Sequence, residues 1–265
     1  VCLNNALAKE GYSLEVKKNY KFKKVVTIYN FFTKNLKNKI LNKKNKITIK
    51  ENSEIHIIDY TINESKFKFI NNVCENVILE KNSKFKNISI QGNRSNGYFH
   101  KFSKNKLLSN SSYTNFIFSS GLKFNKLDIE CDLEEKNSEC NVQSALFLNT
   151  NDHQEIKTRI NHLAENCKSY QKVKSVLSPD SKGVYQGKIY VKNIAQKTNA
   201  YQLSKALLLS SNSEFDSKPE LEIYADNVKC SHGSTSGSID EDSLYYLMTR
   251  GLNRKESTKL LIKGF

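Results

Sequence analysis

Apolar and polar residues alternate over short stretches along most of this chain, and one phrase recurs. An alternating apolar run leads into a polar turn, Asn-Ser-Glu or Asn-Ser-Lys, and a second alternating run follows. Four copies occupy residues 46–60, 77–92, 134–148 and 207–223, and a weaker copy at 187–202 has Ile194-Ala195-Gln196 at the turn. The first two copies superpose with Asn52 on Asn82 and Ile55 on Phe85.

Alternation with a period of two is typical of strands with one buried face. Asn tolerates the left-handed backbone that a sharp corner between two strands requires. Short strands and corner Asn residues, repeated at intervals of tens of residues, predict a stacked parallel β-solenoid. An antiparallel sandwich with similar turns is the alternative. The chain has only two Pro and one Asn-Gly pair, Asn96-Gly97, so hairpin signals are scarce and we favour the solenoid.

The pattern changes at Ser238. Ser238 and Glu241 have the spacing of a capping box, Leu244, Leu247 and Met248 share one helical face, and Gly251 follows as a stop signal. Asn253 and Glu256 repeat the cap for a second helix that carries Leu260 and Leu261. We therefore expect one β-helix core over 1–237, loop-rich over 93–152, and a helical hairpin over 238–265 that closes the end of the stack.

Composition narrows the function classes. The 265 residues carry 42 basic and 27 acidic side chains, a net charge of +15, which raises the possibility of a nucleic-acid partner. However, the basic residues are 38 Lys against 4 Arg, and Asn reaches 32. Phosphate-binding surfaces favour the bidentate Arg fork, whereas Lys and Asn rise together in AT-rich genomes. No run approaches eighteen apolar residues, which argues against a transmembrane helix.

Cysteine spacing and sequence motifs exclude several kinds of site. The six Cys residues stand at 2, 74, 131, 140, 167 and 230, without a Cys-x-x-Cys pair. A structural zinc site is therefore not expected, and so few Cys in this length indicate a reducing compartment rather than a disulfide framework. The chain has no Walker loop, no Gly-x-Gly-x-x-Gly and no Gly-x-Ser-x-Gly, so neither an ATP site nor an α/β-hydrolase triad is indicated.

Acidic groups and histidines are the remaining candidates for chemistry. The acidic runs at 132–135 and 240–242 are expected in turns and a first helical turn. His153 and His162 stand nine residues apart, with Cys167 just beyond, so packing or a buried hydrogen bond is the expected role rather than metal binding. Cys230 and His232 are two residues apart, and on a strand both side chains project from the same face. A thiolate beside an imidazole suits zinc, iron or an iron–sulfur centre, although two ligands do not complete a site.

The last ninety residues contain five distinctive segments: SPDSKGVYQGKIYV, AQKTNAYQ, LLLS, KPELEIYADNVKCSHGSTSG and SLYYLMTRGL. Together these segments resemble the SufB/SufD family of iron–sulfur cluster assembly scaffolds. It is strong from Ser178 onward and weak over 93–152, while residues 3–31, 75–91 and the segment around HQEIKTRINH also fit the family core. The stretch around Cys230 looks like SufD, because SufB proteins typically have a Val-Glu-His-Glu-Ala run there and a core Cys that this chain does not match.

This resemblance implies a right-handed parallel β-helix followed by C-terminal helices, in a complex of SufB, SufD and a pair of SufC ATPases. It implies a nascent iron–sulfur cluster at the SufB–SufD junction, with His232 as the matching ligand and Cys230 as a tentative second one. Residues Ser238–Phe265 would dock on SufC, and the chain would be a scaffold rather than an enzyme. Bacterial cytoplasm and plastids are the family's locations, and the AT-type composition favours a parasite plastid, the apicoplast.

Alternatives remain open at this stage. One alternative is a SufB-like scaffold, and another is a β-helix enzyme acting on carbohydrate, which would need clustered carboxylates in an open groove. In isolation it could pair with a second copy through its late strands. The sequence assigns no flavin site.

Overall fold

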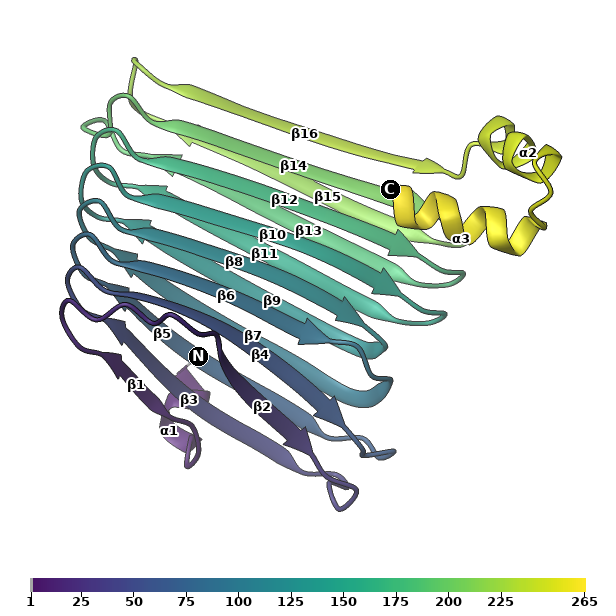
Figure 1. Cartoon of the computed structure of the whole chain (residues 1–265), viewed down its shortest axis with the longest axis horizontal. Helices are drawn as coiled ribbons and strands as arrows, with labels where there is room; N and C mark the ends of the chain where they lie inside the picture. Colours follow the sequence, from purple (N-terminus) through teal and green to yellow (C-terminus); the bar gives the residue numbers. More distant parts are fainter. Residues whose placement is uncertain (1) are drawn as a thin grey trace.

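The computed structural model describes residues 2–265, with backbone alone for Cys2, Leu3 and Asn5, and it is a parallel β-solenoid (Figure 1). Each turn contributes one strand to each of two eight-stranded sheets. The odd-numbered strands form one sheet in the order β1-β3-β5-β7-β9-β11-β13-β15, and the even-numbered strands form the other, from β2 to β16. Every strand pair is parallel. The solenoid predicted from the repeats is therefore confirmed.

The strands are mostly ten residues long, and short helices flank them. The elements are α1 (Cys2–Leu7), β1 (Ser13–Val16), β2 (Val26–Phe32), β3 (Ile40–Ile49), β4 (Glu54–Asn63), β5 (Ile70–Leu79), β6 (Lys84–Gln91), β7 (Ser95–Leu107), β8 (Ser112–Ser120), β9 (Leu122–Leu133), β10 (Glu139–Leu148), β11 (His153–His162), β12 (Lys168–Leu177), β13 (Lys182–Val191), β14 (Asn199–Leu208), β15 (Glu214–Ile223), β16 (Lys229–Ser238), α2 (Glu241–Thr249) and α3 (Arg254–Gly264).

The corner from the odd to the even sheet is built on Asn residues in the left-handed conformation. Asn52 and Asn82 have φ angles of 58° and 57°, and Ile55 pairs with Phe85 in register, as the superposition of the first two copies predicts. Asn side chains stack along this corner, each donating to the amide oxygen one turn earlier. This asparagine ladder comprises Asn19, Asn52, Asn82, Asn110, Asn137 and Asn166.

The residue after each ladder Asn explains the rest of the recurring phrase. The Ser83 hydroxyl donates to the Glu80 carbonyl at 2.6 Å, and Ser138 donates to Glu135 at 2.8 Å, which closes the turn from inside. Cys167 takes the same position after Asn166, so a thiol replaces the hydroxyl in that turn. The repeat at 207–223 differs from the others, because its turn lies on the opposite corner, between β14 and β15.

The interior has an apolar side, a polar middle and an aromatic side. Beside the asparagine ladder, aliphatic side chains and buried Cys fill the space between the sheets, among them Ile49, Leu79 and Cys131. In the first turns, Phe32, Phe69 and Phe99 pack together near the opposite corner. Between these two clusters lies a cavity with polar walls. The five Cys residues whose side chains are described are all free thiols.

Residues 93–152 differ from the expectation of loops. This stretch forms strands β7 to β10 in continuous register with their neighbours, with one irregularity between Ser95 and Tyr98. Its many Asn and Ser residues lie inside strands and at corners, as Asn105 and Asn115 do in the interior. The polar composition of this stretch suggested exposed loops. The suggestion was wrong because the interior of this solenoid accepts polar side chains, so polar residues here also occupy buried strand positions.

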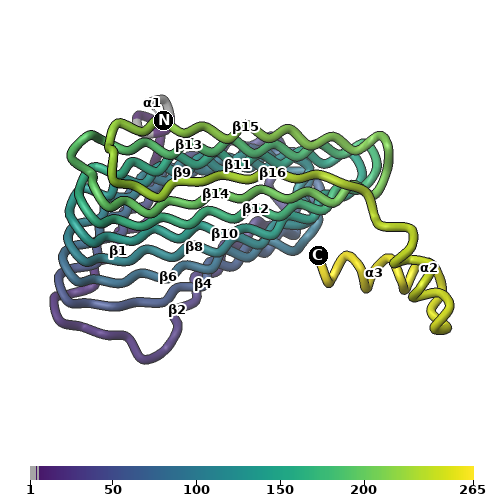
Figure 2. The backbone as a smooth tube through the Cα atoms, turned by 90° about the horizontal axis from the view of Figure 1, so that it is seen from above, coloured from purple at the N-terminus to yellow at the C-terminus, as the bar shows by residue number. Residues whose placement is uncertain are grey.

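The C-terminal helices also differ in two details. The N-cap of α2 is Asp240, whose carboxylate accepts from the Ser243 amide at 2.9 Å, rather than Ser238, which is the last residue of β16. The capping box of Asn253 and Glu256 is present on α3, and Gly251 adopts a φ of +94° between the helices, as predicted. Seen along the stack, both helices lie beside the turns and leave the last turn uncovered (Figure 2). The hairpin therefore does not close the end.

Candidate functional site

The last turn of the solenoid presents two open sheet edges side by side. Strand β15 pairs with β13 alone, and β16 pairs with β14 alone, within residues 2–265. An unpaired edge strand offers a row of free backbone donors and acceptors to another chain. The end of the stack therefore exposes two rows of backbone hydrogen-bonding groups.

Cys230 and His232 lie on β16 and face the same side, as the spacing predicts. Cys230 pairs in register with Ala200 and His232 with Gln202, and both of those partners are buried in the interior. Both side chains therefore stand on the inward face of a turn that has no turn above it. Cys230 is half-buried against the cluster of Ile189, Val191 and Ala225, whereas His232 is exposed.

The two candidate ligands differ in their electrostatic surroundings. Burial raises the pKa of the Cys230 thiol, and a backbone hydrogen bond at Ala200 opposes this effect only in part. The thiol is therefore kept protonated, while a metal ligand must be a thiolate. His232 is open to solvent on the same face, so of the two it is the more accessible donor.

The layer beneath the site is polar and rigidly connected. Ser204 lies 2.9 Å from the Ser217 hydroxyl of β15 and donates to Ser234 of β16 at 2.8 Å, which ties the two edge strands to the turn below. Gln202, directly below His232, donates to the Gly187 carbonyl at 3.3 Å, while its amide oxygen is buried without a partner in the described residues. Of these bonds, the one between Ser204 and Ser234 holds the strand that carries His232.

Large apolar side chains are exposed at two separate places in the last turn: at the end of β15, and on α2, which follows the opposite end of β16 (Figure 1). Leu221 and Ile223 on the inward face of β15 are each 36% exposed, and Tyr224 beyond them is 60% exposed. On α2, Tyr245 and Tyr246 are 71% and 56% exposed. Exposed large apolar residues mark candidate interaction surfaces, and the end of β15 and α2 are two separate ones.

His153 and His162 lie at opposite ends of β11 and do not meet, in agreement with the sequence analysis. His153 stacks on Phe124 with ring centroids 5.3 Å apart. His162 is fully buried, its Nε2 lies 2.9 Å from the Ser169 hydroxyl, and burial lowers its pKa to about 3. Cys167 lies in the core beside Ser138, with its sulfur 3.2 Å from the hydroxyl. These three residues therefore have packing roles.

The acidic runs have structural roles too. The carboxylate of Glu134 pairs with Lys106 at 2.5 Å, and Glu135 accepts from the Ser109 amide at 2.9 Å. Glu241 and Asp242 lie in the first turn of α2, where their negative charges interact favourably with the helix dipole.

Within the described residues, no group of three or more His, Cys, Asp or Glu is arranged to hold a metal ion. None of the helices in the described part of the chain is long and apolar enough to cross a membrane.

Comparison with known proteins agrees with this architecture. Residues 31–265 match the model of the family described as SUF system FeS cluster assembly, SufBD core domain. The chain is 34% identical to the iron–sulfur cluster assembly protein SufD of Escherichia coli over 63% of this chain and 40% of that protein. It is 27% identical to the chloroplastic protein ABCI7 of Arabidopsis thaliana over 83% of this chain and 46% of that protein.

A SufB protein is matched at lower identity. The iron–sulfur cluster assembly protein SufB of Bacillus subtilis is 23% identical over 99% of this chain and 56% of that protein. The chain thus spans about half the length of the curated relatives it matches. With the family model covering all but the first thirty or so residues, the chain belongs to the SufB/SufD family of the SUF system for iron–sulfur cluster assembly, and it is more like SufD than SufB.

Proposed function

We propose that this chain is the SufD-like scaffold subunit of a complex with SufB and SufC, and that it contributes His232 to a nascent iron–sulfur cluster at the SufB junction. The observation that carries the proposal is the open last turn. Both of its strands have an unpaired edge, and β16 presents the exposed imidazole of His232 on its inward face. Its role is that of a scaffold, with the chemistry of ATP hydrolysis in SufC.

The open edges explain how SufB would bind. Strands β15 and β16 each have one unpaired edge in the described chain, so the strands of a similar solenoid can extend both sheets across the junction. Such pairing would cover Leu221 and Ile223. SufB is the expected occupant because it shares the fold family. Without SufB, the same edges would pair two copies of this chain.

The cluster is the cargo of this site. Iron–sulfur clusters are held by Cys thiolates, with imidazole replacing thiolate in some centres. His232 supplies one donor, and Cys230 is the candidate second donor once metal binding displaces its thiol proton into solvent. The remaining donors come from SufB in this proposal. A site divided between two proteins can release its cluster when the junction opens, whereas a complete site within one chain would retain it.

The C-terminal helices are the proposed SufC surface. Residues Ser238–Phe265 project beside the stack (Figure 1), and they are tied to it where Lys174 of β12 donates to the Phe265 carbonyl and lies over its ring. Tyr245 and Tyr246 of α2 are exposed. ATP-driven movement of SufC would then pull on the strand that carries His232, because β16 leads directly into α2.

We place the protein in a plastid stroma, and specifically in an apicoplast, with bacterial cytoplasm as the alternative. The Lys and Asn excess points to an AT-rich genome, and one relative is chloroplastic while others are bacterial.

Co-expression with SufB and SufC tests the proposal. We expect the three proteins to purify together, and we expect His232→Ala to assemble normally while anaerobic reconstitution with iron and sulfide yields little cluster absorbance. The matched control is His56→Ala, since His56 lies on the outer face of β4 and pairs with Glu54 at 3.0 Å. Normal cluster yield from the His232 variant would overturn the ligand assignment, and failure to co-purify would overturn the complex.

A further inference from the structure

The two open edges of the last turn present different sets of backbone groups. In a parallel ladder, alternate residues of a strand direct their N–H and C=O to the same neighbouring strand. The amides of Glu214 and Tyr224 donate to carbonyls at either end of β13, at 3.0 and 2.9 Å, and the register between the two strands is unbroken. The even-numbered residues of β15 are therefore bonded to β13. The residues that face the open edge are Phe215, Ser217, Pro219, Leu221 and Ile223.

Pro219 stands at the centre of this open row, and proline has no backbone N–H. Its ring occupies the place from which a donor would reach a further strand, and for this reason proline is confined to the edges of sheets. A partner strand therefore cannot pair along the whole of β15. The row is divided into Phe215 and Ser217 on one side of the proline and Leu221 and Ile223 on the other.

The open edge of β16 has no such interruption. The Lys229 amide donates to the Thr198 carbonyl at 2.8 Å, so the odd-numbered residues of β16 are bonded to β14. The even-numbered residues face the open edge, and each has a backbone N–H: Cys230, His232, Ser234, Ser236 and Ser238. Both candidate cluster ligands thus belong to the row that a partner strand can bind without a gap.

Charged side chains distinguish the two edges in the same sense. The outer face of β15 carries five charged residues in succession: Glu214, Asp216, Lys218, Glu220 and Glu222. The outer face of β16 carries one, Lys229, followed by small uncharged residues. Proline and charged side chains are means by which proteins protect a sheet edge against pairing. The edge of β15 is therefore protected, whereas the edge of β16 is not.

Pro219 lies across the interior from His232. One turn below, the register partner of Pro219 is Gly187. The register partner of His232 is Gln202, and its side-chain amide donates to the Gly187 carbonyl at 3.3 Å. Adjacent strands of a sheet are only about 4.8 Å apart, so the residues of the last turn keep this arrangement. The break in the edge of β15 therefore faces the imidazole proposed as a cluster ligand.

We propose that SufB pairs with this chain along the whole edge of β16 but along only part of β15, and that Pro219 is the positioning residue that limits the second pairing to Leu221 and Ile223. These two side chains are apolar and each 36% exposed, and they precede the corner that leads into β16. The inference rests on the proposed function, because it takes SufB as the occupant of this end.

The consequence is a junction that is closed on one side only. Backbone hydrogen bonds join the even sheets along their full length, while the odd sheet stays unpaired from Phe215 to Pro219. The wall opposite His232 is then open to solvent beside the cluster. This one-sided pairing gives a transient cluster a route in and out while β16, the strand that carries the ligand, remains bound to SufB.

Hydrogen–deuterium exchange of the complex with SufB, resolved to single amides by mass spectrometry, tests the pairing. Relative to the dilute free chain, SufB should protect the amides of the β16 row and those of Leu221 and Ile223. The amides of Phe215 and Ser217 should exchange as fast as in the free chain. Equal protection of Phe215, Ser217 and the β16 row would overturn the inference, and so would an unprotected β16 row.

Pro219→Ala supplies the missing N–H. SufB should dissociate from this variant about 2- to 10-fold more slowly, as expected for one added backbone hydrogen bond, measured by surface plasmon resonance. The reconstituted cluster of this variant should also lose iron more slowly to the chelator EDTA. Pro179→Ala is the matched control, because it replaces the other proline, in the turn between β12 and β13, without adding a donor to an open edge. It should behave as the wild type does.

The outcomes separate this inference from the function on which it rests. If SufB binds the wild type but dissociates at the same rate from the Pro219 and Pro179 variants, the role of Pro219 is wrong and the complex stands. If the wild type does not capture SufB at all, the proposed function is wrong, and the one-sided junction is wrong with it.

Discussion

Asn82 donates from Nδ2 to Oδ1 of Asn52 one turn earlier, at 2.9 Å, while both residues hold left-handed backbone angles. Asn therefore has two structural roles at this corner. The backbone turns the chain from one sheet to the other, and the side chain fixes the spacing of adjacent turns. The asparagine ladder therefore couples local conformation to the stacking of the whole solenoid.

Substitution inside the asparagine ladder should be destabilising for a backbone reason. Asn110 has a φ of 56° and bonds to both Asn82 and Asn137. Asn110→Ala should lower the free energy of unfolding by roughly 1–3 kcal/mol, because Ala disfavours this conformation and the amide bonds are lost. Urea unfolding measures the change. Asn110→Gly is the control and should cost less; an equal loss in both variants would mean that the side-chain bonds alone matter.

Close packing at Gly187 should make that position intolerant of a methyl group. A Cβ there would lie 2.6 Å from Cδ of Gln202 and closer still to Oη of Tyr185, both fully buried. Gly187→Ala should lower the free energy of unfolding by about 1–3 kcal/mol, measured by urea denaturation. At Gly237 nothing lies within 4 Å of an added Cβ, so Gly237→Ala should be nearly neutral. Equal stability of the two variants would show that the Tyr185 layer adjusts.

Acid should weaken the fold through His162. Burial lowers its pKa to about 3 in the folded chain, against 6.5 as the ordinary value. Between these values the unfolded chain binds a proton that the folded chain does not, so the free energy of unfolding falls as pH decreases from 6.5 toward 3. The loss at pH 5 should be about 2 kcal/mol.

The measurement is chemical denaturation at neutral and acid pH. The His162→Gln variant should lose less stability on acidification than the wild type, since Gln does not titrate. His153→Gln is the control, because His153 is only partly buried and stacks on Phe124. If the His162 and His153 variants show the same acid sensitivity, burial of the neutral imidazole does not contribute to pH dependence.

Docking on SufC should depend on the helical region. Deletion of Ser238–Phe265 should abolish SufC capture in a pull-down, and Tyr245→Ser should weaken it, because Tyr245 is 71% exposed on α2 and large aromatic residues dominate interfaces. Tyr20→Ser is the matched control, as Tyr20 is 55% exposed at the other end of the chain. Capture that survives the deletion would show that SufC binds elsewhere.

The architecture could be predicted from the sequence alone, because the alternation of strands, the Asn corners and the helix caps are each properties of a short stretch of chain. Alternation specified strands, Asn52 and Asn82 specified a repeating corner, and Asn253 with Glu256 specified the cap of α3. The spacing of Cys230 and His232 likewise fixed that they share a face of one strand. Local signals failed where two caps competed, so that Asp240 rather than Ser238 caps α2.

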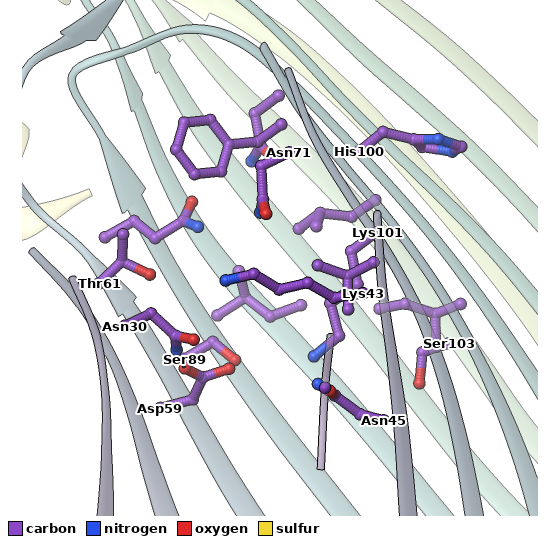
Figure 3. Close-up of a pocket in the computed structure, with 18 of the residues that line it drawn as sticks. Asn30, Lys43, Asn45, Asp59, Thr61, Asn71, Ser89, His100, Lys101 and Ser103 are labelled. Atoms are coloured by element: carbon purple, nitrogen blue, oxygen red, sulfur yellow. Dashed lines mark hydrogen bonds between the residues drawn. The ribbon is translucent and has the colours of Figure 1, made fainter. Parts of the chain in front are cut away.

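Only the tertiary structure decided which inward positions are filled and which are open. Lys43 and Lys44 are indistinguishable in a lysine-rich stretch, yet one extends into the polar-walled cavity between the sheets (Figure 3) and the other into solvent. The strands of 93–152 and the uncovered last turn could not be predicted from the sequence for the same reason. Both depend on contacts between residues about thirty positions apart, and the burial of a side chain in a solenoid is determined by the turns above and below it rather than by its neighbours in sequence.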